Sequence, residues 1–129
     1  MPRRRYALLW LALSTMTLSP AVVACFHGNS SIIVPEQPKT TVHVSNGEFL
    51  DAVIYVVNHG QPVRLGIASS NRTTTFEIPK HMIFGATPLS FQVHPIGANI
   101  QPSTGDVMID PGDDLDLQIS GGRLVLTRR

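Results

Sequence analysis

The densest group of side chains that could do chemistry is a run of carboxylates near the C-terminus. Four aspartates fall within seven residues, at Asp110, Asp113, Asp114 and Asp116. Carboxylates at this density suit Ca²⁺, which takes six to eight oxygen ligands. Their spacing differs from that of a helix–loop–helix calcium loop, and residues 110–113 (Asp-Pro-Gly-Asp) already form a strong β-turn sequence. We therefore interpret the group as a solvated turn and keep the four aspartates only as candidate metal ligands.

Histidine is the other common metal ligand, and four histidines follow residue 40. None of them pairs at i, i+2 or i, i+4 with another ligand type, so three would have to converge through the fold to make a zinc site. Alternation of apolar and polar residues places His43 and His94 at outward strand positions, whereas His59 and His81 lie in loops. We expect no metal or other cofactor.

No catalytic motif occurs in the chain. The sequence lacks a G-x-S-x-G elbow, an H-E-x-x-H pair, a phosphate-binding P-loop and a C-x-x-C pair. Scattered Ser, His and Asp residues single out no nucleophile. The sequence therefore predicts a protein that is not an enzyme, with a hydrolase as the third alternative behind two binding functions.

The single cysteine, Cys25, follows an N-terminal segment typical of an exported protein. Three arginines at residues 3–5 precede an uncharged apolar stretch at residues 6–18, and Ser19-Pro20 ends it. This stretch is shorter than the roughly 17–25 residues of a membrane-spanning helix and fits the apolar region of a signal peptide. The arginines faintly resemble a twin-arginine signal, but the strongly apolar stretch favours the general secretory route. A buried N-terminal helix of a cytosolic domain is the alternative.

Residues 22–25 (Val-Val-Ala-Cys) resemble the lipobox of bacterial lipoproteins. The resemblance implies a diacylglyceryl group on the Cys25 sulfur, cleavage between Ala24 and Cys25, and acylation of the new amino terminus by a fatty acid such as palmitate. Two or more acyl chains hold a protein at a membrane, where one chain holds it only marginally. The alternative is an ordinary signal peptide cut elsewhere, which would leave an odd free thiol. We expect a protein anchored to a bacterial membrane in the cell envelope, facing the periplasm or the exterior.

Processing at Cys25 would change the charge of the protein. From Cys25 onward the chain has seven basic and nine acidic residues, a net charge of −2 in place of the +1 of the whole chain. A weakly acidic protein has no electrostatic footprint for nucleic acid. A mature chain with one cysteine cannot form an internal disulfide, so hydrophobic packing must stabilise its domain.

From residue 40 onward the sequence predicts short β-strands. Apolar residues alternate with polar ones, and Gly, Pro, Asn and Asp separate the runs at the spacing typical of sandwiches and barrels. The eight candidates lie at residues 40–44, 52–57, 62–67, 73–78, 88–94, 107–109, 115–119 and 124–126. The predicted fold class is therefore all-β, an antiparallel β-sandwich of about seven or eight strands.

The predicted organisation has three parts: a signal peptide at 1–24, a lipidated Cys25 with a flexible tether at 25–39, and the sandwich at 40–129. Residues 32–34 (Ile-Ile-Val) are an optional extra edge strand. Within the sandwich, we expect residues 58–61 to form a four-residue hairpin loop.

In the strand after that loop, period-two alternation predicts two sets of side chains. Val63, Leu65 and Ile67 are expected to point into the core, with Arg64 and Gly66 pointing away.

The order of turns and strands resembles small immunoglobulin-like or transthyretin-like β-sandwich modules. The residues that carry the resemblance are Asn46-Gly47, Val53–Val57 (VIYVV), Arg64-Leu65-Gly66, residues 75–79 (TFEIP) and residues 110–113 (DPGD). The chain also resembles short bacterial lipoproteins in which such a domain follows a lipobox. The resemblance covers about 80 residues and implies a fold, with no catalytic residue to transfer. The Cys–Trp–Cys core of antibody-type domains is missing.

Together these features predict a non-enzymatic, lipid-anchored cell-envelope protein that acts as an interaction or structural module. The expected partners are the membrane, through the lipid, and another protein or envelope component. A small-ligand or metal-binding envelope lipoprotein, using loops at one end of the sandwich, is the alternative.

The lipobox predicts that Cys25→Ala abolishes membrane anchoring, because the acceptor sulfur is lost. We expect the tagged variant to move from the membrane fraction to the soluble fraction after ultracentrifugation, while Ser30→Ala stays with the membranes. If Cys25→Ala remained bound to membranes to the same extent as the parent, the anchoring hypothesis would fail.

Overall fold

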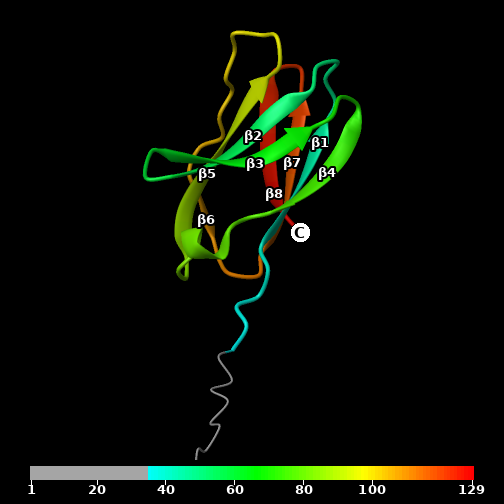
Figure 1. The fold of residues 1–129 in the computed structure, drawn as a ribbon. Helices are drawn as coiled ribbons and strands as arrows, with labels where there is room; N and C mark the ends of the chain where they lie inside the picture. Colours follow the sequence, from blue (N-terminus) through cyan, green and yellow to red (C-terminus); the bar gives the residue numbers. More distant parts are fainter. Residues whose placement is uncertain (1–34) are drawn as a thin grey trace, which may run out of the picture. The chain divides into compact units, whose positions relative to one another are not determined.

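Alternating apolar residues give each strand one face to bury, and the strands bury it between two four-stranded sheets (Figure 1). A computed structural model describes residues 35–129. The strands are β1 (Thr41–Asn46), β2 (Ala52–Asn58), β3 (Gln61–Ala68), β4 (Arg72–Glu77), β5 (Thr87–Pro95), β6 (Val107–Ile109), β7 (Asp114–Ser120) and β8 (Arg123–Arg128). One turn of 3₁₀ helix, η1 (Lys80–Met82), lies between β4 and β5. The predicted all-β sandwich is confirmed, whereas Ala24, Cys25 and residues 32–34 lie outside the described residues.

The sheets have the strand orders β4-β1-β7-β8 and β3-β2-β5-β6. Successive strands run in opposite directions, so β1 and β7 run the same way and pair in parallel, with Val42 opposite Leu115 and Val44 opposite Leu117. All other pairs are antiparallel. The expectation of a purely antiparallel pair of sheets therefore needs one correction, at the centre of the first sheet.

The core lies between the two sheets and takes side chains from every strand. Its largest fully buried members are Phe91, Ile54, Ile78, Ile83, Leu89, Ile109, Leu115 and Leu117. Strand β2 lies between β3 and β5 in its sheet, which explains its nearly continuous apolar sequence. Within residues 35–129 there is no helix long and apolar enough to cross a membrane.

A β-bulge in β3 overturns part of the predicted side-chain alternation. Gly66 pairs with Ile54 and Arg64 with Tyr55, so Leu65 is an extra residue in the register. A bulge shifts the alternation by one residue. As a result Ile67 is 42% exposed instead of buried. Gly66 faces inward, toward Phe76 of β4.

The connection between β2 and β3 is tighter than the expected four-residue loop. Asn58 pairs with Gln61, which leaves a two-residue turn of His59 and Gly60. Both residues have positive φ angles, 47° and 77°. Two-residue hairpins require this geometry because it matches the twist of the strands. The hairpin predicted from the sequence is confirmed, but the loop is two residues shorter than predicted.

The first described residues lie along the domain. The Gln37 side-chain amide donates to the carbonyl of Ile83 (3.0 Å), and Lys39 forms an ion pair with Glu77 (3.2 Å). Residues 35–39, which the sequence places in the tether, therefore contact the sandwich just before β1 begins.

The close contact at Gly66 predicts a large effect of a small substitution. A Cβ atom added there would lie 2.5 Å from Cε1 of Phe76, which is closer than real Cβ contacts. We expect Gly66→Ala to lower the free energy of unfolding by about 1–3 kcal/mol, because overpacking displaces the ring and its strand. Urea denaturation measures this change.

Gly105→Ala is the matched control. A Cβ atom at Gly105 meets no heavy atom within 4 Å, and the residue does not have a positive φ. The interpretation fails if the two variants have equal stability.

Candidate functional site

Four loops that are distant in the sequence meet at one end of the sandwich, which we call the loop end (Figure 1). They follow β1, β3, β5 and β7 and comprise residues 47–51, 69–71, 96–102 and 121–122. The chain enters the domain at the opposite end, through residues 35–40. A partner approaching the loop end would therefore meet no part of residues 35–40.

The loop end exposes large apolar side chains. Eight large hydrophobic residues are exposed in the described part of the chain, and four of them lie here. They are Phe49 (91% exposed), Leu50 (43%), Ile96 (49%) and Ile100 (56%), and three of them, Phe49, Leu50 and Ile100, line a common hollow. Clustered exposed apolar side chains mark interaction sites on folded domains.

An apolar hollow of about 270 Å³ opens within the loop end. Its lining comes mainly from the first and third loops and from the end of β7. The lining residues are Glu48, Phe49, Leu50, Pro95, Ala98, Ile100, Pro102, Ile119 and Gly122. The hollow can accept an apolar group, and Phe49 projects beside it.

The buried amide of Asn46 holds the first loop in place. This last residue of β1 is only 2% exposed. Its Nδ2 donates to the carbonyls of Leu50 (2.9 Å) and Ala68 (3.1 Å), and its Oδ1 accepts from the backbone N–H of Glu48 (3.0 Å). One side chain thus satisfies backbone groups of the first loop and of the end of β3.

Two acidic residues connect the first loop to the other three, two of these through side-chain carboxylates and the third through a backbone carbonyl. Glu48 accepts from the backbone N–H of Gly122 (3.0 Å), and Asp51 accepts from that of Ser70 (2.8 Å). The backbone N–H of Ile96 donates to the carbonyl of Asp51 (2.8 Å). Because the four loops are cross-linked, the backbone that carries the apolar side chains is positioned before a partner binds, which lowers the entropic cost of binding.

A second group of polar side chains lies on the outer face of the sheet β4-β1-β7-β8. The Oγ1 of Thr75 lies 2.7 Å from Nδ1 of His43, and Nε2 of His43 lies 2.9 Å from Oδ1 of Asp114. An ionised carboxylate only accepts, so Nε2 of His43 carries the hydrogen that is shared with Asp114. The hydroxyl of Thr41 also donates to Asp114 and, with His43, holds the pKa of that carboxyl below its ordinary value.

The connectivity of hydroxyl, imidazole and carboxylate is that of a nucleophile, a base and its orienting acid. Acyl transfer also needs donors aimed at the developing oxyanion. Here β1 and β7 are paired on both sides, so their backbone N–H groups serve the sheet. The nearby hollow of about 250 Å³ includes Asp116 and Thr127 on the β7–β8 side of His43, whereas Thr75 lies on the β4 side. The group therefore ties three strands together and does not direct its hydroxyl into a hollow.

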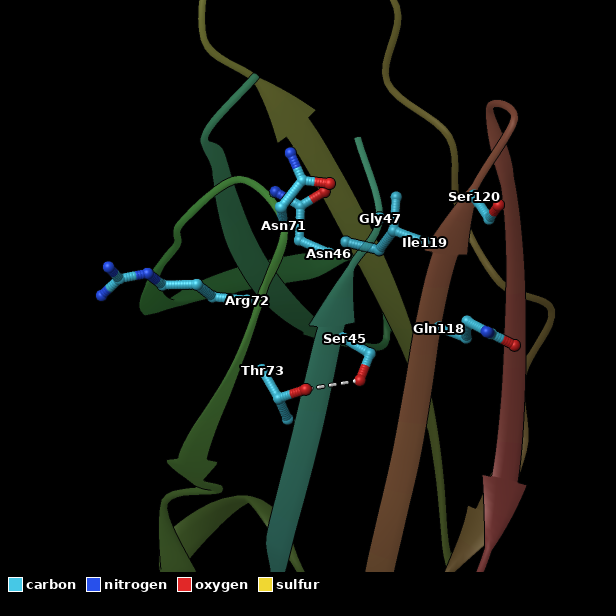
Figure 2. Close-up of a pocket in the computed structure, with 9 residues that line it drawn as sticks. All are labelled: Ser45, Asn46, Gly47, Asn71, Arg72, Thr73, Gln118, Ile119 and Ser120. Carbon is cyan, nitrogen blue, oxygen red and sulfur yellow. Dashed lines mark hydrogen bonds between the residues drawn. The ribbon is translucent and has the colours of Figure 1, made fainter. Parts of the chain in front are cut away.

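A larger polar hollow, about 320 Å³, adjoins the loop end where β1, β4 and β7 meet it (Figure 2). Ser45 and Thr73 in its wall are hydrogen-bonded to each other (2.7 Å). The guanidinium of Arg72 extends away from the other labelled side chains. The hollow thus offers hydroxyl and amide groups, whereas the one basic side chain of its lining, Arg72, is directed away from it.

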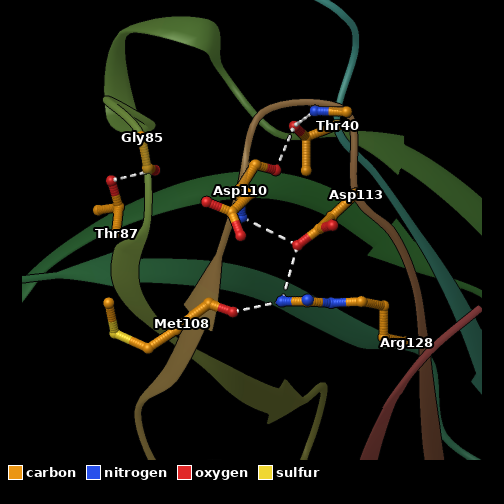
Figure 3. Close-up of polar contacts among 8 residues, drawn as sticks. Thr40, Gly85, Thr87, Met108, Asp110, Asp113 and Arg128 are labelled. Carbon is orange, nitrogen blue, oxygen red and sulfur yellow. Dashed lines mark hydrogen bonds and ion pairs between the residues drawn. The ribbon is translucent and has the colours of Figure 1, made fainter.

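The candidate metal ligands at the C-terminal turn do not converge on a common point. Asp113 accepts from the backbone N–H of Asp110 (2.9 Å) and forms an ion pair with Arg128 (2.9 Å), which also donates to the carbonyl of Met108 (2.6 Å) (Figure 3). Asp114 faces His43, and Asp116 pairs with Arg129. In residues 35–129, no three His, Cys, Asp or Glu side chains are placed to hold a metal ion.

The predicted tight turn at residues 110–113 is present. The backbone N–H of Asp113 donates to the carbonyl of Asp110 (3.1 Å), and Gly112 has a φ of 92°. The hydroxyl of Thr40 accepts from the Gly112 N–H (2.9 Å), which ties the turn to the start of β1 (Figure 3). The carboxylates of Asp113, Asp114 and Asp116 therefore have structural partners, and Asp110 takes part in the turn through its backbone.

The remaining histidines are spread over the domain. His59 lies in the β2–β3 turn and His81 in η1. His94 packs against Tyr55 on the outer face of the second sheet, with ring centroids 4.6 Å apart. The four histidines thus form no common site among the described residues.

Comparison with protein-family models finds no family that matches this chain, and no curated protein is similar to it.

The loop end was missed in the sequence because its residues look like ordinary loop residues. The available signal was the presence of large apolar side chains inside polar turn segments: Phe49-Leu50 between Glu48 and Asp51, and Ile96 and Ile100 in a loop rich in Gly, Pro and Asn. Nothing local indicates that these two loops meet in space.

The Asp114 contacts predict a pH-dependent loss of stability. A carboxyl whose pKa is lowered in the folded state stabilises the fold above its ordinary pKa of 3.8 and loses this contribution as the pH falls through the lowered value. We expect Asp114→Asn to lower the melting temperature at pH 7, and the difference from the parent to shrink at pH 3. Thermal melts from pH 7 to pH 3 test this.

Asp106→Asn is the control. Asp106 is exposed and forms no ion pair with another residue of the 35–129 segment. An Asp114→Asn difference that stayed constant across the pH range would contradict the prediction.

Proposed function

We propose that this protein is a non-enzymatic, lipid-anchored protein of the bacterial cell envelope whose sandwich domain binds another protein through its loop end. The observation that supports this most directly is the gathering of four exposed apolar side chains at the loop end, three of which line an apolar hollow, with the first loop held by Asn46. Burial of apolar surface is the dominant favourable term in protein association.

The anchor in this proposal rests on the lipobox-like residues 22–25, which lie outside the described residues. The geometry of the domain is consistent with it, because the chain enters at the end opposite the loop end.

The resemblance to transthyretin-like modules is part of the same proposal. The strand pairing differs from that of constant-type immunoglobulin domains, in which the first strand pairs with the second. Here β1 pairs with β4 and β7.

Sheet edges favour the loop end over strand addition as the means of binding. The edge strands are β4, β8, β3 and β6. Arg128 of β8 donates to the carbonyl of Met108 on β6 and so connects two of these edges. Charged residues and very short strands at an edge discourage pairing with another chain. A partner therefore finds more accessible apolar surface at the loops than at the edges.

A small-ligand envelope lipoprotein is the second candidate, and the apolar hollow of about 270 Å³ is the observation that favours it. Such a hollow would bury a small apolar molecule, but this molecule would cover only the side of Phe49 that lines the hollow. The exposure of Phe49 is better explained by a partner that covers the whole loop end.

The proposal predicts that Phe49→Ser and Ile100→Ser weaken partner binding without unfolding the domain, because both side chains are more than half exposed. Chemical cross-linking in intact membranes, followed by mass spectrometry of the tagged full-length protein, should show at least one specific adduct that both variants lose.

Phe84→Ser is the matched control, since Phe84 is 81% exposed but lies in the β4–β5 connection and not in the loop end. Retention of all adducts by the two loop-end variants, or equal losses in the control, would refute the loop end as the binding surface.

A further inference from the structure

The loop end combines a projection and a hollow on one surface. Phe49 is 91% exposed, and the apolar hollow of about 270 Å³ opens directly beside it. A cavity of about 150 Å³ lined by apolar side chains is sufficient to hold a benzene ring. The hollow is therefore large enough to accept a phenyl group of the kind that projects next to it.

A surface with both features can bind a copy of itself across a two-fold axis. In such an isologous interface both copies use the same surface. If a residue of the first copy contacts a site on the second, the same residue of the second copy contacts the same site on the first. We propose that the loop end is a homodimer interface in which Phe49 of each copy enters the hollow of the other. This inference rests on the proposed function and names the partner as a second copy of the chain.

The available apolar area is enough for such a contact. Four large side chains, 43–91% exposed, present on the order of 500 Å² if a whole side chain has roughly 200 Å², so a pair would bury about 1,000 Å². This value lies at the lower limit for a specific interface. The structure therefore predicts a weak, reversible dimer.

Pairing of two copies would leave the hydrogen bonds of the loop-end carboxylates in place. The carboxylates of Glu48 and Asp51 already accept hydrogen bonds from the backbone N–H groups of Gly122 and Ser70. Burial of a hydrogen-bonded carboxylate costs less than burial of a free one. Two copies can therefore approach without leaving these two groups unpaired.

Anchoring to one membrane would strengthen a weak dimer and is compatible with its geometry. A tethered pair meets at a raised effective concentration. Strands of six to nine residues are about 20–30 Å long, so the two points where the chains enter would be about 50 Å apart, at opposite ends of the pair. Residues 25–34 can span at most about 35 Å. This length is enough for each chain to reach the membrane when the long axis of the dimer is parallel to the membrane surface.

The first test is self-association of the full-length lipidated protein in detergent micelles, measured by analytical ultracentrifugation. We expect a concentration-dependent dimer whose dissociation constant rises about tenfold or more in Phe49→Ser, since burial of a phenyl ring is lost. Phe84→Ser should dimerise like the parent. A protein that remains monomeric up to the highest concentration in micelles, or equal dimerisation of Phe49→Ser and the parent, would overturn the proposal.

The second test reports the geometry in membranes. One tagged copy carries Phe49→Cys and a differently tagged copy carries Ala98→Cys, which lies in the hollow. Mild oxidation should join the two tags by a disulfide, because these residues would touch across the interface. Val125→Cys, on an exposed residue of β8, replaces Phe49→Cys in the control and should form no such bond.

The outcomes separate the dimer from the broader proposal. If no disulfide joins the two tags but cross-linking gives an adduct to a different protein that Phe49→Ser loses, the dimer is wrong and the protein-binding function stands. If neither a dimer nor any Phe49-dependent adduct forms, both are wrong.

Discussion

The buried amide of Asn46 is the interaction on which the loop end depends. It occupies the last inward position of β1, where an apolar side chain would also fill the core. Instead its three hydrogen bonds satisfy Leu50, Ala68 and Glu48. Leaving buried backbone groups without partners costs about 1–3 kcal/mol for each group. The amide therefore fixes the path of the chain between the sheets and, with it, the direction in which Phe49 projects.

The same end of the domain shows how stability and binding are divided. Core side chains hold the two sheets together, while hydrogen bonds from Glu48 and Asp51 hold the loops that follow the sheets. The exposed apolar side chains of the loops are thus not part of the core cluster. Exposed apolar residues lower solubility unless a partner covers them, so their presence on an ordered surface is best explained by binding.

Much of this fold could be predicted from the sequence because alternation is a local signal. All eight strands follow from it, as does the turn at residues 110–113. The bulge at Leu65 could not be predicted, since it depends on the register between β2 and β3 and on the ring of Phe76 opposite Gly66. The parallel pairing of β1 and β7 depends on which sheet each strand joins, and this is decided by packing over the whole chain. The loop end could not be predicted from the sequence for the same reason, since Phe49 and Ile100 are 51 positions apart in the chain.

The polar face around His43 illustrates why proximity alone does not make a site. Thr75, His43 and Asp114 have the connectivity of a catalytic group, yet each is held by a partner on the neighbouring strand of a continuous sheet. The central strands β1 and β7 offer no free backbone donors, and the hydroxyl of Thr75 does not line the neighbouring hollow, so transition-state charge would be left to water. The loop end has the opposite character: it offers little chemistry, but it has shape, exposed apolar area and positioned side chains. Those properties suit recognition of a folded partner, and they are the reason for proposing the loops, and not the polar sheet, as the binding surface.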